Sequence, residues 1–187
     1  MKLLLSEDWV YPWYGEAFLR RFRELGVDAH PFKTQPYFSP VGQRAGGAFG
    51  RLWANVQRRF RWGPLVTRLN ADLLAKVDRW EPDVVFLYRG DLFLPSTLRQ
   101  LKDRSVLIAG LNNDDPFSQA YPRYTWRHLL QGLPLHDLYF SYRSCNIPQY
   151  QAQGCPHVSL LRSYYVRELH YPLPDVTASP FLCDVSF

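Results

Sequence analysis

The sequence predicts an α/β protein with a doubly wound, mostly parallel, Rossmann-like sheet that carries helices on both faces. Two observations lead to this fold class. Short apolar runs alternate along the chain with longer segments in which apolar residues recur at helical spacing, and this alternation is typical of parallel sheets with right-handed crossovers. Two of the runs, 84–88 and 106–111, are almost continuously apolar, as expected for strands that helices cover on both sides.

The beginning of the chain predicts a strand, a helix and a second strand. Residues 2–5 form a short apolar run that fits a buried strand. A helix is expected over 15–25 because its apolar residues share one face, and Gly26 follows at a position where glycine commonly ends a helix. Residues 27–32 then fit the second strand.

Two amphipathic helices are expected next. In the first, an apolar stripe lies opposite most of the arginines, and we expect the stripe to face the core. The second helix carries a similar stripe and ends before Glu81-Pro82. The stripes consist of Phe49, Leu52, Trp53, Val56 and Phe60 in the first helix and of Leu65, Leu69, Leu73, Val77 and Trp80 in the second.

The rest of the chain repeats the alternation and brings the expected number of strands in the layer to six. Strands are expected over 84–88, 106–111, 137–142 and 158–161, and helices over 95–102, 122–131 and 147–153. Residues 1–170 are therefore expected to form one Rossmann-like domain. Residues 171–187 are expected to form a proline-rich linker and the first strand of a second domain that is missing or truncated; the alternative is that this last strand completes the same sheet.

Charge and hydropathy indicate a soluble, cytoplasmic protein. No apolar run approaches the roughly 20 residues that span a bilayer, and the apolar start is too short for a secretory signal. The three cysteines are too few for a disulfide scaffold, and their spacing does not fit structural zinc, so no metal is expected. The net charge of +5 comes from one segment, since Ala29 to Ala71 contains seven basic residues and no acidic one.

The middle of this basic segment interleaves arginine with aromatic residues, which leaves three interpretations open. The commonest case is a core-facing helix with a solvated basic back. The second is peripheral contact with an anionic membrane, at its inner face. Nucleic acid comes last because no recognised binding motif accompanies the charge. The residues concerned are Arg51, Trp53, Arg58, Arg59, Arg61 and Trp62.

Polar residues follow three of the predicted strands. In an open parallel sheet, ligands bind outside the carboxyl ends of the strands, so we expect these residues to converge on one crevice. The candidates for binding substrate are Glu7, Asp8, Arg89, Asp91, Asn112 and Asn113. Arg89 and Asp91 fit a substrate clamp in which the arginine takes a carboxylate or a phosphate, or an ion pair with each other at the rim of the sheet.

Asp114 and Asp115 are the candidate catalytic residues. Adjacent carboxylates raise each other's pKa, and one of them could act as a general base towards a hydroxyl group. Asp115 directly precedes Pro116, a pattern that is also typical of a helix N-cap. Asp114 is therefore the stronger candidate for the crevice.

Four segments in order resemble one family. They are Asp83-Val84-Val85-Phe86-Leu87-Tyr88-Arg89-Gly90-Asp91, Asn113-Asp114-Asp115-Pro116, Asp137-Leu138-Tyr139-Phe140-Ser141 and Asn146-Ile147-Pro148-Gln149-Tyr150 with Gly154. They look like the N-terminal half of the CgeB-like, spore-maturation-type glycosyltransferases of the glycosyltransferase-B fold. The closing Asp184-Val185-Ser186-Phe187 resembles the strand that opens the second half of these proteins.

The resemblance implies two Rossmann-like domains facing across a cleft. The C-terminal domain would hold most of the nucleotide sugar, the N-terminal domain would shape the acceptor site, and transfer would need no metal or other cofactor. Asp114 and Asp115 fall on the family's Asp-Asp-Pro motif. The expected function is thus that of the acceptor-binding domain of a glycosyltransferase, inactive without its donor-binding half. The alternative is a non-catalytic Rossmann-like module that binds a ligand or regulates.

Overall fold

The computed structural model describes residues 1–9, 11, 13–39, 47–162 and 165–166. They form one six-stranded sheet in the order β2-β1-β3-β4-β5-β6, and every neighbouring pair is parallel. The predicted fold class is confirmed. The strands are β1 Lys2–Glu7, β2 Asp28–Lys33, β3 Val84–Tyr88, β4 Leu107–Asn112, β5 Leu138–Ser141 and β6 Val158–Leu160.

The helices connect the strands as expected, with one clear difference. They are α1 Gly15–Glu24, α2 Gly47–Phe60, α3 Pro64–Trp80, α4 Pro95–Asp103, α5 Arg127–Gly132 and α6 Ile147–Ala152, with 3₁₀ turns at Gln35–Tyr37, Leu133–Leu135 and Ser144–Asn146. The helix predicted over 122–131 begins only at Arg127. The bond from the Thr125 amide to the Pro122 carbonyl makes an isolated turn that is not continued. The expected linker and second-domain strand, residues 171–187, lie outside the described residues, as do residues 163–164 and 167–170 at the end of the expected domain.

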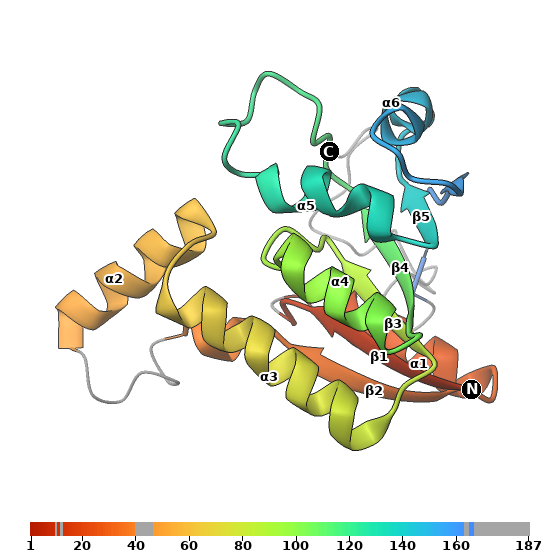
Figure 1. The fold of residues 1–187 in the computed structure, drawn as a ribbon, viewed down its shortest axis with the longest axis horizontal. Coiled ribbons are helices and arrows are strands. Elements are labelled where there is room, and N and C mark those ends of the chain that lie inside the picture. Colours follow the sequence, from red (N-terminus) through yellow and green to blue (C-terminus); the bar gives the residue numbers. More distant parts are fainter. Residues whose placement is uncertain (10, 12, 40–46, 163–164, 167–187) are drawn as a thin grey trace, which may run out of the picture.

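Alternate residues of the central strands face two separate cores, so the sheet is covered on both sides. In β3, Val85 and Leu87 belong to the core beneath α3 and α4. Phe86 and Tyr88 point the other way, into the core formed with Leu19 of α1. Figure 1 shows α3, α4 and α5 side by side across one face of the sheet. This arrangement leaves the carboxyl ends of the strands as the open edge.

Helix α2 corrects one sequence-based prediction. Its apolar stripe was expected to face the core, but Phe49, Leu52 and Trp53 are exposed, and Ala54 and Gln57 are the buried positions. The side of the helix that faces the domain carries Ala54 and Gln57, and arginines at its C-terminal end form ion pairs with carboxylates of the sheet edge. In Figure 1, α2 projects from the body of the domain beyond the N-terminal end of α3. Among the described residues, no helix is both long and apolar enough to cross a membrane.

Candidate functional site

A crevice of about 440 Å³ lies at the carboxyl ends of the strands. It sits where β1 and β3 are neighbours although the chain visits β2 between them, which is the switch point at which open α/β sheets bind ligands. Six of the eight residues predicted for the site line it. These are Glu7, Asp8, Arg89, Asp91, Asn113 and Asp114.

The other two predicted residues support the crevice from outside its lining. Asn112 is fully buried, and its Oδ1 accepts a hydrogen bond of 3.1 Å from the amide of Asp114. Asp115 Oδ1 accepts bonds from the Phe117 amide at 3.0 Å and from the Asn146 side chain at 2.9 Å. The side chain of Asp115 thus accepts a bond from the amide two residues on, as an N-cap does, but the bond closes a turn and no helix begins at Pro116. This geometry gives Asp115 a structural role.

The turn after β3 aims the next polar residues into the crevice. Arg89 has a φ of +70° and Gly90 a φ of +72°, a left-handed conformation that is rare for a residue with a Cβ. The Arg89 amide donates to the Leu111 carbonyl at 2.6 Å, which ties the turn to β4. The Arg89 guanidinium lies 4.9 Å from the ring centroid of the buried Trp126, within range for a cation–π contact.

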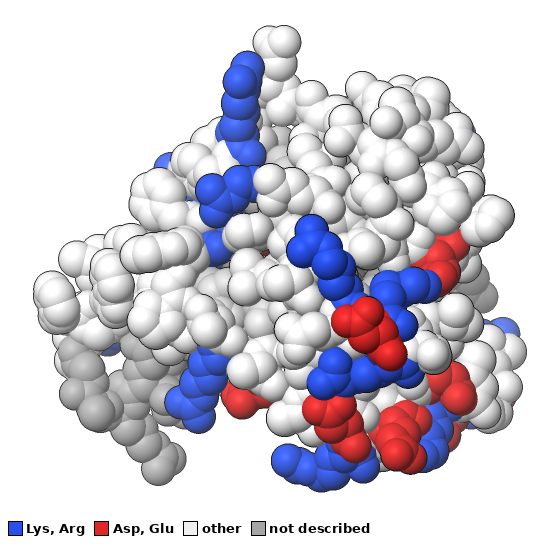
Figure 2. Space-filling model, in the orientation of Figure 1, with Lys and Arg blue, Asp and Glu red and all other residues white. Residues whose placement is uncertain are grey.

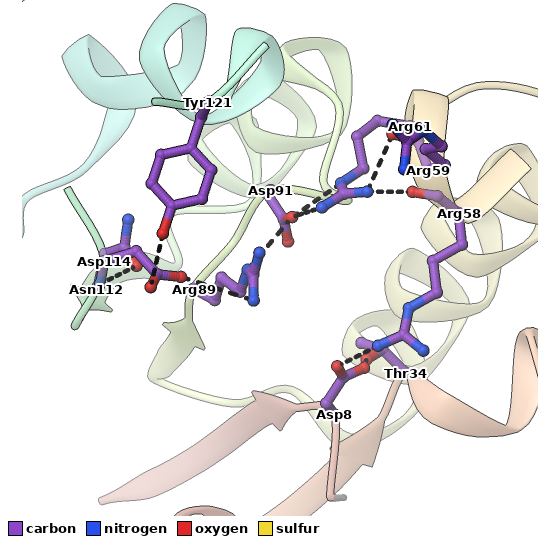
Figure 3. A network of polar contacts seen from close by, with 10 residues as sticks. All are labelled: Asp8, Thr34, Arg58, Arg59, Arg61, Arg89, Asp91, Asn112, Asp114 and Tyr121. Carbon is purple, nitrogen blue, oxygen red and sulfur yellow. Dashed lines mark hydrogen bonds and ion pairs between the residues drawn. The ribbon is translucent and has the colours of Figure 1, made fainter. Parts of the chain in front are cut away.

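Ion pairs run from β4 towards α2 across the crevice (Figure 3). Arg89 Nη1 lies 3.6 Å from Asp114 Oδ2, and Arg89 Nε lies 3.4 Å from Asp91 Oδ2. The same Asp91 oxygen accepts a hydrogen bond from Arg61 Nε at 2.8 Å and lies 2.5 Å from Arg61 Nη2 in an ion pair. Asp91 and Arg61 are both largely buried, with 7% and 12% of their side chains exposed. The predicted rim ion pair of Arg89 and Asp91 is present, joined by two further groups.

The same contacts continue to the far side of the crevice. Arg61 donates to the backbone carbonyl of Arg58, and Arg58 Nη2 donates to Asp8 Oδ2 at 2.5 Å. Thr34, which follows β2, donates its hydroxyl to the other carboxylate oxygen of Asp8 at 2.9 Å. We call this chain of contacts the crevice network. Its members are Tyr121, Asp114, Arg89, Asp91, Arg61, Arg58, Asp8 and Thr34.

Sequence reasoning missed the contribution of α2 to the site. The sequence leaves Arg58 and Arg61 on a surface that is solvated, faces a membrane or binds nucleic acid, whereas both line the crevice. The available signal was the complete lack of acidic residues in the basic segment, which means that any ion-pair partner must come from elsewhere. The lack of acidic residues does not indicate which of the arginines form an ion pair. Thr34 and the aromatic lining residues Tyr11 and Tyr14 were also missed.

Glu7 is the titratable group of the crevice that stands out. Only 5% of the residue is exposed, and burial raises its pKa to about 7, with a further rise from the charge of Asp8 and an opposing hydrogen bond from the Trp9 amide. A carboxyl with a pKa near 7 can accept or donate a proton at neutral pH, as a general base requires. Gly15 makes room for it, because a Cβ there would lie 2.7 Å from Glu7 Oε2.

The charges of the crevice nearly cancel. Three arginines are matched by three aspartates of the crevice network, and Glu7 is about half protonated near neutral pH. Such a lining offers many hydrogen-bonding groups without a strong net charge, and it suits an uncharged ligand rich in hydroxyl groups. Among the described residues, no group of three or more His, Cys, Asp or Glu side chains is placed to hold a metal ion.

The fold and the site together define the class of this protein: it is a Rossmann-like domain with a polar crevice at the switch point of its sheet. The sequence matches no protein-family model, and no curated protein matches it either. The function must therefore be argued from the crevice itself.

Proposed function

We propose that this chain is the acceptor-side domain of a glycosyltransferase, and that its crevice binds the hydroxyl-bearing acceptor of a sugar from a nucleotide-sugar donor. The observation that carries the proposal is Glu7, a buried carboxyl with a pKa of about 7 in the crevice. The balanced charge and aromatic lining of the crevice favour a saccharide-like ligand. The likeness of the 83–91 and 113–116 segments to the CgeB-like enzymes supports the same reaction class.

The roles of the crevice carboxylates follow from which of them are already paired within the protein and which are available to a ligand. Asp8 accepts from Thr34 and Arg58 through both oxygens, and Asp91 holds two guanidinium groups. Within the described residues, the contacts of the Asp114 carboxylate are long, 3.4 Å to the Tyr121 hydroxyl and 3.6 Å to Arg89. We assign Glu7 to removal of the acceptor's proton and Asp114 to orienting the acceptor hydroxyl by a hydrogen bond.

The reaction balances with these roles. The acceptor oxygen forms a bond to the anomeric carbon, the bond from that carbon to the phosphate oxygen breaks, and the acceptor's proton passes to Glu7. The nucleoside diphosphate leaves with the electron pair of the broken bond. A general base of this kind contributes about 10²–10⁴-fold to the rate. Donor binding is assigned to a second Rossmann-like domain.

The test is transfer by the protein in its full genetic length, measured as release of nucleoside diphosphate from a panel of nucleotide sugars with saccharide acceptors. We expect Glu7→Gln to lower kcat at least about 100-fold and Asp114→Asn to raise the KM for acceptor. Asp78→Asn is the matched control, since Asp78 pairs with Arg104 outside the crevice. No release with any donor, or an unchanged kcat in Glu7→Gln, would contradict the proposal. Saccharide binding without any transfer would support the non-catalytic module instead.

A further inference from the structure

Helix α2 presents large apolar side chains to solvent. Phe49 is 79% exposed, Leu52 62% and Trp53 44%, and two more apolar residues at the other end of the helix extend the surface. We call this surface the α2 apolar face; it consists of Phe49, Leu52, Trp53 and Phe60 of α2 and of Trp62, two residues after the helix ends. In Figure 2 the surface over α2, at the left, is almost entirely uncharged, and most of the acidic side chains in view lie at the lower right.

The exposure does not come from a loosely attached helix. Ala54 and Gln57, on another side of α2, are buried, and Gln57 accepts a hydrogen bond of 2.8 Å from the Leu65 amide at the start of α3. Arg58 and Arg61 fasten its C-terminal end to the sheet edge through Asp8 and Asp91. The helix is thus held so that its apolar face points outward, and contiguous exposed apolar surface of this kind marks an interaction site.

The charges around this face indicate what it binds. Arg51 and Arg59 are exposed on α2, and the whole segment from Ala29 to Ala71 has no acidic residue. Two copies of the chain that met through α2 would bring together these arginines, for which the described part of the chain shows no carboxylate partner. Nucleic acid would need many phosphate contacts, but Arg58 and Arg61 are already paired with carboxylates of this chain. An apolar surface with exposed arginines on the same helix is complementary to an anionic bilayer.

We propose that α2 docks this domain on an anionic phospholipid surface. The helix lies in the plane of the interface with Phe49, Leu52 and Trp53 among the acyl chains, while Arg51 and Arg59 contact the lipid phosphates. Tryptophan suits this depth because its ring is apolar and its N–H is polar. Arg58 and Arg61 of the same segment line the crevice, so docking holds the crevice beside the lipid surface.

The experiment is sedimentation of the intact protein with vesicles of phosphatidylcholine alone and of phosphatidylcholine and phosphatidylglycerol in a ratio of three to one. We expect binding to the anionic vesicles only. The Arg51→Gln/Arg59→Gln variant should bind about 25-fold more weakly, since each basic residue near the surface favours binding about fivefold. The Phe49→Ser/Leu52→Ser/Trp53→Ser variant should lose at least about 100-fold.

Leu25→Ser is the matched control, because Leu25 is 63% exposed at the end of α1, away from α2. It should bind like the wild-type protein. The charge variant keeps the apolar face and tests the proposal even if the triple serine variant fails to fold, which circular dichroism would reveal. Lack of binding to anionic vesicles, or equal binding by the charge variant and the wild type, overturns the proposal. Dimerisation that the triple variant abolishes, without vesicle binding, identifies a second copy as the occupant and overturns it as well.

Discussion

Replacing Glu7 by glutamine should change how the stability of the protein depends on pH. In the folded chain the pKa of Glu7 is about 7, against an ordinary value of 4.5. As the pH rises between these values the unfolded chain loses the proton first, so the free energy of unfolding falls. The full shift corresponds to about 3.4 kcal/mol, and about 2.5 kcal/mol of it falls between pH 5 and pH 8. Glutamine keeps the shape of the side chain but does not titrate.

The assay is urea denaturation of wild type and Glu7→Gln at a series of pH values across this range. The stability of the variant relative to wild type should increase by about 2.5 kcal/mol from pH 5 to pH 8. Other titrating groups, such as His136, whose pKa burial lowers to about 4, are common to both proteins and cancel in the difference. Parallel stability curves would refute the reasoning, because they would mean that Glu7 ionises alike in the folded and unfolded states.

Gly15→Ala probes the same carboxyl without removing it. A Cβ at Gly15 would lie 2.7 Å from Glu7 Oε2 and 2.9 Å from the ring of Trp9, so the carboxyl must move from its buried position. We expect the pKa of Glu7 to fall towards its ordinary value, and the pH dependence relative to Glu7→Gln to shrink. An unchanged pH dependence in Gly15→Ala would show that Glu7 is not confined by this contact.

Two further changes test the packing around the site. Asp91→Asn leaves the largely buried Arg61 without its ion-pair partner and should cost about 3 kcal/mol of unfolding free energy. Asp78→Asn, which ends a solvent-exposed ion pair, should leave the urea midpoint nearly unchanged, and equal effects of the two would contradict the importance of burial. In Gly110→Ala the new methyl group would lie 2.5 Å from the buried ring of Tyr139. We expect a cost of about 2 kcal/mol and a fall in Tm of about 6 °C by calorimetry; an unchanged Tm would show that the ring can move aside.

The sequence carries the fold because strands and helices leave local periodic patterns. The stripe that includes Leu69, Leu73 and Val77 is buried as predicted, and the apolar run 84–88 coincides with β3. The α2 stripe has the same periodicity, yet it points outward. Periodicity shows that one face of a helix differs from the other, but the partners available in three dimensions decide which face is covered.

The position of the crevice could be predicted from the sequence, but most of the contacts within it could not. Topology alone brings Glu7, Arg89 and Asp114 to one edge of the sheet, since the carboxyl ends of parallel strands lie together. The pairing of Arg61 with Asp91 depends on how the C-terminal end of α2 approaches that edge, and no local pattern encodes this. The raised pKa of Glu7 likewise depends on burial by residues distant in the sequence.

The arginines shared by helix and crevice have a thermodynamic consequence. A ligand that hydrogen-bonds to Asp8 would share that carboxylate with Arg58, and the Arg58–Asp8 ion pair is one of the two that fasten α2. We expect a ligand that displaces Arg58 from Asp8 to lower the free energy that holds the helix in place. If a crevice ligand changes the affinity of α2 for its partner by some factor, linkage requires that the partner change the affinity of the crevice for the ligand by the same factor. The same two arginines, Arg58 and Arg61, thus belong both to the attachment of α2 and to the lining of the crevice.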